Sequence, residues 1–114
     1  MGWQWSSYNK YGNLKCQYKG IIFDSKKECE YFIYLESLEA QGEISELQRQ
    51  VRFELQPSFK FNGKTIRSIT YVADFTFKDK DGQLHIVDTK GIKTEVYKLK
   101  KKMMQFQGHD IEEV

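Results

Sequence analysis

The chain has 114 residues, which is enough for one domain and too few for two. Hydrophobic residues make up 39% and aromatic residues 15%, so a packed core is feasible, and a net charge of +2 by itself favours no class of partner. No apolar run is long enough to span a membrane and the N-terminus lacks a signal-peptide pattern, so we expect a cytoplasmic protein.

The first part of the chain predicts a hairpin followed by a helix. Residues 1–10 have no periodicity and are expected to form a flexible segment that precedes one domain from 11 to 114. Residues 13–23 predict a short hairpin that turns near Lys19-Gly20. A helix is predicted from Ser25 to Ala40, because Gly42 just beyond it is a natural stop.

The cysteines, Cys16 and Cys29, are not expected to form a close pair. With only His85 and His109 besides, they provide no zinc set of the usual spacing. We expect no disulfide framework, and we expect Cys29 to pack as a small apolar residue on a helix.

The middle of the chain predicts extended segments. Ser45 to Leu55 mixes apolar and polar residues as a strand does, and Pro57 interrupts it, so an edge strand or a connection should follow. Asn62-Gly63 predicts a tight turn before a long strand that begins near Ile66.

Residues 69–77 and 83–90 predict a hairpin that carries acidic residues at one end. Its turn, Asp79-Lys80-Asp81-Gly82, fits a three-residue loop with Gly82 in the left-handed conformation. That loop sets Asp74 directly opposite Asp88, on one face, whereas a loop of two or four residues would place them on opposite faces. Asp88 and Lys90 then share a face, and Thr89 points away.

Two interpretations of this hairpin stay open from the three residues alone. Asp74 and Asp88 could hold a magnesium ion beside a phosphate, with the Lys90 ammonium next to the attacking water. They could equally be unrelated acids on a surface hairpin.

The last part of the chain predicts a helix and a short strand. Between Thr94 and Gln107, apolar residues recur at helical spacing and predict one buried stripe: Val96, Leu99, Met103 and Phe106. Gly108 should end the helix, and residues 111–114 predict a strand. The element order predicts an α+β fold, with one mixed sheet of four to five strands flanked by two helices.

Glu28 is a third acid that could contribute to the same site. On a helical wheel it lies in line with Tyr31, Phe32 and Leu35, the side that should pack on the sheet. A carboxylate facing the core needs a partner, and a metal ion is one. Ser25 and Glu28 also form the pattern of a capping box, which explains the glutamate without a metal.

Two groups of basic residues suit a nucleic-acid backbone. The first group lies among tryptophans and tyrosines near the N-terminus and the second follows the acidic hairpin. The candidates for backbone contacts are Lys10, Lys15, Lys19, Lys93, Lys98, Lys101 and Lys102. The alternative is a solvated lysine-rich helix face and a loose tail.

Four ordered blocks of sequence resemble a family of small phage-encoded proteins placed in the PD-(D/E)xK nuclease superfamily, close in type to Holliday junction resolvases. The blocks span residues 23–28, 70–75, 87–91 and 93–98. The resemblance covers roughly Tyr11 to the C-terminus and implies a restriction-endonuclease-like core. Ala73 stands where the name-giving proline would be, and Asp88 replaces the frequent glutamate.

The resemblance implies a role for each matching residue. Glu28, Asp74, Asp88 and Lys90 would be catalytic, and the metal ligands would be Asp74, Asp88, Glu28 and the Thr89 carbonyl. The implied cofactor is Mg2+, with Mn2+ as a substitute. The implied activity is that of a DNA endonuclease on branched or structured DNA, working as a homodimer in the host cytoplasm.

Two further functions are alternatives. A protein with the same fold could bind nucleic acid without cleaving it, although such a protein has no reason to keep two acids near a phosphate. A phage protein could also bind a host protein, with the acids merely on its surface.

Overall fold

The computed structural model describes residues 3–5 and 16–114. The chain divides into two compact units, residues 1–44 and 45–114, and the single domain from 11 to 114 stays a prediction. The expected α+β class is confirmed, with two helices and a four-stranded mixed sheet. Over the described residues, no helix is long and apolar enough to cross a membrane.

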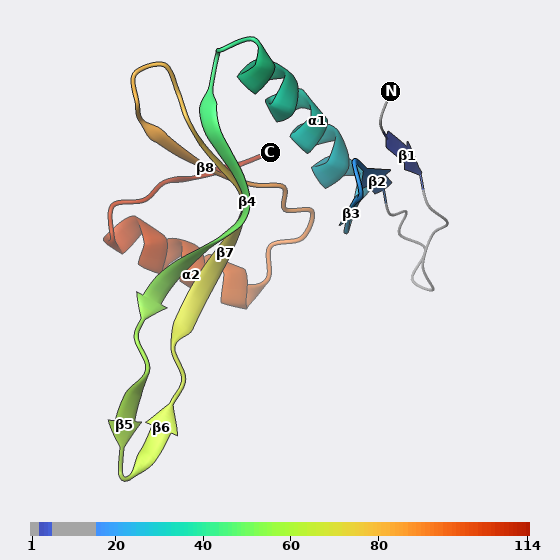
Figure 1. Ribbon diagram of the computed structural model, residues 1–114. Helices are drawn as coiled ribbons and strands as arrows, with labels where there is room; N and C mark the ends of the chain where they lie inside the picture. Colours follow the sequence, from blue (N-terminus) through green and yellow to red (C-terminus); the bar gives the residue numbers. More distant parts are fainter. Residues whose placement is uncertain (1–2, 6–15) are drawn as a thin grey trace. The chain divides into compact units, whose positions relative to one another are not determined.

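The N-terminal unit contains a small antiparallel sheet and the first helix (Figure 1). Its strands are β1 (Trp3–Trp5), β2 (Cys16–Tyr18) and β3 (Ile21–Phe23), and β2 lies between the other two. The predicted turn at Lys19-Gly20 joins β2 to β3, and both residues have positive φ, 52° and 80°. Apart from β1, the predicted flexible segment lies outside the described residues.

Helix α1 (Lys26–Ala40) begins and ends where its sequence predicts. The Glu28 N–H donates to Ser25 Oγ at 3.1 Å, so Ser25 is the N-cap. Gly42 follows the helix with a φ of 78°, a conformation that favours glycine. Glu28, Cys29, Phe32 and Leu35 are the buried residues of α1, which confirms that Glu28 lies on the buried side.

Cys16 and Cys29 form a disulfide, which corrects the expectation that they do not pair. Cys16 lies at the start of β2 and Cys29 in the first turns of α1, with 6.0 Å between their Cα atoms. Sequence spacing alone could not show this, because the two positions meet only once the hairpin has turned back toward the helix.

The C-terminal unit is built on a sheet of order β4-β7-β8-β9 (Figure 1). These strands span Ser45–Gln56, Ile69–Lys78, Leu84–Asp88 and Ile111–Glu113. The first three are antiparallel neighbours, and β9 runs parallel to β8. Helix α2 (Glu95–Phe106) is the crossover between those two parallel strands.

The register of the β7–β8 hairpin is the one predicted from its turn. The Asp79 N–H donates to the Gln83 carbonyl at 3.0 Å, and Gly82 has a φ of 81°. The pairs run from Lys78 with Leu84 to Phe75 with Val87. Extending this register by one residue sets Asp74 opposite Asp88.

Helix α2 packs on the sheet through a different face from the predicted one. Its buried residues are Tyr97 and Met104, which join Tyr71, Ala73 and Ile86 in the core of this unit. The predicted stripe was wrong, because three of its members are exposed: Val96, Leu99 and Phe106. The buried face was missed because Tyr97 carries a hydroxyl and was not counted as hydrophobic, which left Met104 as its one apolar residue in the pattern.

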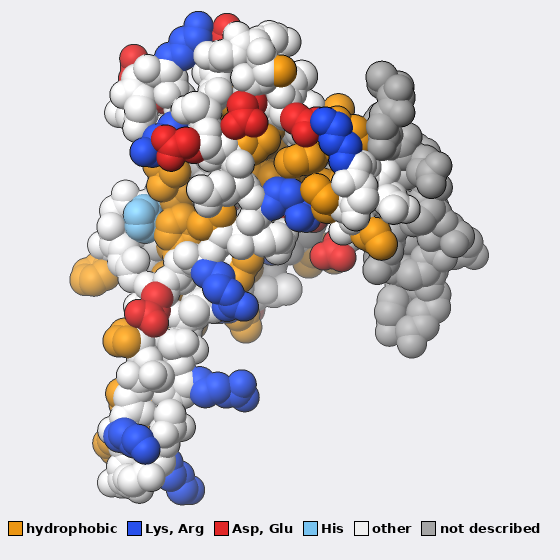
Figure 2. Space-filling view, viewed as in Figure 1, with side chains coloured by type: hydrophobic (Ala, Val, Ile, Leu, Met, Phe, Trp, Pro, Cys, Tyr) orange, Lys and Arg blue, Asp and Glu red, His pale blue; other side chains and the backbone are white. Residues whose placement is uncertain are grey.

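A second hairpin extends away from the sheet as a separate two-stranded ribbon (Figure 1). It consists of β5 (Phe59–Phe61) and β6 (Lys64–Ile66), joined by the predicted turn at Asn62-Gly63. All its residues are exposed, and Figure 2 shows basic and hydrophobic side chains standing out along it.

Candidate active site

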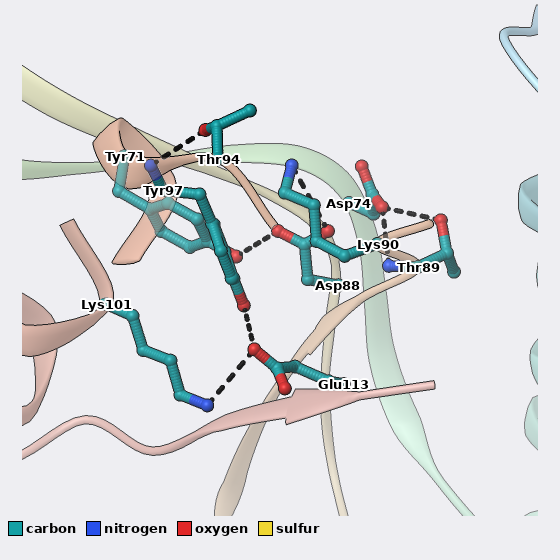
Figure 3. Close-up of polar contacts among 9 residues, drawn as sticks. All are labelled: Tyr71, Asp74, Asp88, Thr89, Lys90, Thr94, Tyr97, Lys101 and Glu113. Atoms are coloured by element: carbon teal, nitrogen blue, oxygen red, sulfur yellow. Dashed lines mark hydrogen bonds and ion pairs between the residues drawn. The ribbon is translucent and has the colours of Figure 1, made fainter. Parts of the chain in front are cut away.

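Two neighbouring strands bring polar residues to one end of the β7–β8 hairpin (Figure 3). Strand β7 contributes Tyr71 and Asp74, and β8 ends at Asp88. Thr89 and Lys90 follow directly, where the chain leaves the sheet toward α2. The structure thus brings together Asp74, Asp88 and Lys90, the convergence that the site hypothesis requires.

Asp88 is the most buried acid of the site, with 1% of its surface exposed. Its Oδ2 atom accepts a hydrogen bond of 2.5 Å from the Tyr71 hydroxyl. Its Oδ1 atom is buried and accepts no hydrogen bond, and the Lys90 Nζ lies 3.6 Å from it. A buried carboxylate oxygen without a hydrogen-bond donor is costly. The Lys90 ammonium offsets its charge without a hydrogen bond, so the oxygen keeps lone pairs that a metal ion could use.

Asp74 is held by the backbone and side chain of Thr89. Its Oδ2 atom accepts the Thr89 N–H at 2.8 Å and the Thr89 hydroxyl at 2.7 Å. The expectation that the Thr89 side chain points away was wrong, since β8 ends at Asp88 and strict alternation ends with it. Both bonds go to the same oxygen of Asp74 and fix the orientation of its carboxylate.

The electrostatics of the site centre on the two carboxylates. Burial raises the pKa of Asp88 above its ordinary value, and the negative charge of Asp74 raises it further. The Tyr71 hydrogen bond and the Lys90 charge lower that pKa, so they favour the ionised form. Burial, and then Asp88, raise the pKa of Tyr71, which keeps its hydroxyl protonated as a donor.

A second polar cluster, centred on Glu113 of β9, supports the first. Glu113 accepts from the Tyr97 hydroxyl at 2.7 Å and pairs with Lys93 at 2.9 Å and Lys101 at 3.1 Å. These contacts, the Tyr97 hydrogen bond foremost, lower the Glu113 pKa to about 2. The Lys90 Nζ lies 4.9 Å from the centre of the Tyr97 ring, so Tyr97 joins the two clusters.

Tyr71, Tyr97 and Glu113 were not predicted from the sequence. The signal for Tyr71 was weak, because it lies three residues before Asp74 in the predicted strand, an odd offset that strict alternation places on the other face. Glu113 had none, since only the crossover through α2 brings β9 beside β8.

Of the lysines predicted to contact nucleic acid, four form ion pairs with acidic side chains. Lys19 pairs with Glu36, Lys98 with Glu95, and Lys93 and Lys101 share Glu113. Lys102 is exposed. Lys10 and Lys15 lie outside the described residues. Their role in binding a backbone stays a prediction.

Glu28 belongs to the N-terminal unit, while Asp74, Asp88 and Lys90 belong to the C-terminal unit. Within its own unit it is buried and forms part of the predicted cap, through its N–H and Ser25. Its role as a metal ligand stays a prediction.

The residues of the C-terminal unit fit a divalent cation in part. Asp74 and Asp88 provide two neighbouring carboxylates, and the Thr89 carbonyl would be a third oxygen ligand of the type that Mg2+ prefers. Over the described residues, no three His, Cys, Asp or Glu side chains converge as a metal set. The free Oδ1 atom of Asp88 is the observation in favour of the cation.

Comparison with known proteins adds a family but no function. A family model described as "Protein of unknown function (DUF1064)" matches residues 8–114. No curated protein and no solved structure matches the chain.

Proposed function

The chain belongs to the DUF1064 family, and from its site we propose that it is a Mg2+-dependent DNA endonuclease. The observation that carries the proposal is the convergence of Asp74, Asp88 and Lys90, with one buried Asp88 oxygen free of hydrogen bonds. Two adjacent carboxylates with a lysine beside them form the acid-x-lysine arrangement of the PD-(D/E)xK superfamily, which the chain resembles in sequence.

Asp74, Asp88 and the Thr89 carbonyl would hold the metal, with Glu28 as a further candidate. A bound Mg2+ would stabilise charge on the phosphate and lower the pKa of a bound water. Two features of the protein prepare this position. The Tyr71 hydrogen bond lowers the pKa of Asp88 and so favours its ionised form, and Thr89 fixes Asp74 through its N–H and hydroxyl.

Lys90 is the candidate to orient the attacking water and to offset phosphate charge. Its ammonium lies 3.6 Å from Asp88 Oδ1 and against the face of Tyr97, so two groups restrict its position. A lysine held this way loses little conformational freedom when a phosphate arrives.

Branched or structured DNA is the proposed substrate, because the family that the sequence resembles is close in type to Holliday junction resolvases. The lysine-rich segment from Lys93 onward would contact the backbone, and such contacts position a substrate without specifying it. A resolvase acts on two strands, so a homodimer is expected. The proposed location is the cytoplasm, that of the host for a phage-encoded protein.

The test is a cleavage panel of linear, flapped and four-way DNA, each with Mg2+, with Mn2+ and with EDTA. We expect cutting that requires metal and falls by at least about a hundredfold in Asp88→Asn. Asp81→Asn is the matched control, because Asp81 is an exposed acid of the same hairpin. Thermal unfolding gives a second readout: Mg2+ should stabilise the wild type and not Asp88→Asn.

Absence of cutting on every substrate, or an Asp88→Asn variant as active as wild type, would overturn the enzyme. Salt-sensitive DNA binding without cutting would instead select the nucleic-acid-binding module on the same fold.

A further inference from the structure

A cavity of about 320 Å³ lies beside the site, between the start of β7 and the first turns of α2. It shares Lys90 and Tyr71 with the site, so a molecule bound in it would lie next to Asp88. Its size leaves room for a phosphate group and several waters, at about 30 Å³ for each water.

The lining of this cavity is positive. Lys90 and Lys100 both line it, and none of its described lining residues is acidic. Lys100 is half-buried and has no ion pair among the described residues, unlike Lys98 and Lys101 on the same helix. A partly buried ammonium without a carboxylate is available to an anion from outside.

The remaining polar groups of the cavity are hydrogen-bond donors of the kind that phosphate oxygens accept. Thr70 and Thr94 line it with hydroxyl groups. Thr94 is also the N-cap of α2, so the cavity meets the positive end of that helix. Tyr97 also lines the cavity, and since its hydroxyl already donates to Glu113 at 2.7 Å, the two threonines are the hydroxyl donors that remain.

We propose that this cavity binds a backbone phosphate that neighbours the one at Asp74 and Asp88, with Lys100 as its principal contact. This inference rests on the proposed function, since it assumes a nucleic-acid chain at the site. It adds a binding residue that lies outside the acid-x-lysine pair. Holding the neighbouring phosphate would fix the position of the scissile one.

The test compares Lys100→Ala with Lys64→Ala, which removes an exposed lysine charge of the same unit, on β6 and outside the cavity. Duplex binding is measured by fluorescence anisotropy in EDTA, so that the result does not depend on cleavage. We expect Lys100→Ala to bind about tenfold more weakly and to lower the salt slope by about 0.9, the effect of one lost phosphate contact. Lys64→Ala should stay within about twofold of the wild type.

Duplexes with a single neutral methylphosphonate linkage provide the second measurement. One position should weaken binding to the wild type and leave Lys100→Ala unaffected, which identifies the phosphate that the cavity holds. Paired substrates with a 5′-phosphate or a 5′-hydroxyl distinguish an internal phosphate from a terminal one. If the cavity holds a terminal phosphate, the substrate with the 5′-phosphate should bind more tightly, and if it holds an internal one, the two should bind equally.

Two negative results have different meanings. A wild type that binds and cuts DNA, with Lys100→Ala binding no more weakly than Lys64→Ala, overturns the cavity proposal and leaves the nuclease proposal standing. A wild type that neither binds nor cuts any DNA overturns both.

Discussion

The hairpins β5–β6 and β7–β8 of the C-terminal unit follow the same local rules and differ in what their side chains contact. Each turns at a glycine with positive φ, 74° at Gly63 and 81° at Gly82. Yet Phe61 of the first is 62% exposed, while Phe75 of the second is fully buried. The turn chemistry therefore decides where a hairpin forms, and not whether it joins a core.

The two hairpins also differ in whether they can shield a carboxylate from water. Only the β7–β8 hairpin is covered by α2 and flanked by β4 and β9, so only it can hold a carboxylate away from water. A two-stranded hairpin with both faces open is marginally stable by itself. The perturbed pKa of Asp88 is thus a product of packing, since the same residue on the open hairpin would be fully hydrated.

The largest expected effect is on the free energy of unfolding, when one aromatic residue is truncated on each hairpin. Phe75→Ala should lower the free energy of unfolding by about 3–5 kcal/mol, because it leaves a cavity in a buried strand. Phe61→Ala should change it by less than about 0.5 kcal/mol. Urea unfolding of the two variants measures both values, and equal losses would contradict the distinction between the hairpins.

The next effect concerns the hydroxyl that supports the buried acid. Tyr71→Phe removes the donor to Asp88 Oδ2, and we expect a loss of about 1–2 kcal/mol of stability. Because the Tyr71 bond lowers the Asp88 pKa, its removal should move the acidic limb of the cleavage profile to higher pH. Activity measured across pH tests the direction. Tyr34→Phe, which alters an exposed tyrosine of α1, is the control and should leave the limb in place.

The smallest expected effect is a dependence of stability on pH, which arises from His85 in the buried-core hairpin β7–β8. His85 of β8 lies between Asp79 and Glu112, and its hydrogen bond to Asp79, followed by that to Glu112, raises its pKa above 6.5. A raised histidine pKa stabilises the fold below about pH 6.5, and the contribution is lost as the pH rises through the folded value. Thermal unfolding should therefore show falling stability above that pH, and His85→Gln should remove this slope. A slope that survives in His85→Gln and disappears in His109→Gln would refute the assignment.

Local patterns predicted much of the fold. The Ser25 cap, the turns at Asn62-Gly63 and Gly82, and the positions of both helices agree with the sequence. The pairing that sets Asp74 opposite Asp88 also followed from loop length, because a hairpin loop fixes register over a few residues. Each of these depends on residues close together in the chain.

What failed depends on distant residues. The face that α2 buries is decided by Tyr71, Ile86 and the other core residues beneath it, and the apolar stripe alone does not reveal it. The disulfide likewise joins positions whose distance only the folded N-terminal unit sets.

The register of the hairpin that carries Asp74 and Asp88 could be predicted from the sequence, since local turn chemistry is enough to define it. Tertiary structure decided the rest of the site. It buried Asp88, placed the Tyr71 hydroxyl and the Lys90 ammonium against it, and brought Glu113 beside Tyr97. The physical reason is that desolvation and hydrogen bonding between distant segments depend on packing, which no short stretch of sequence encodes.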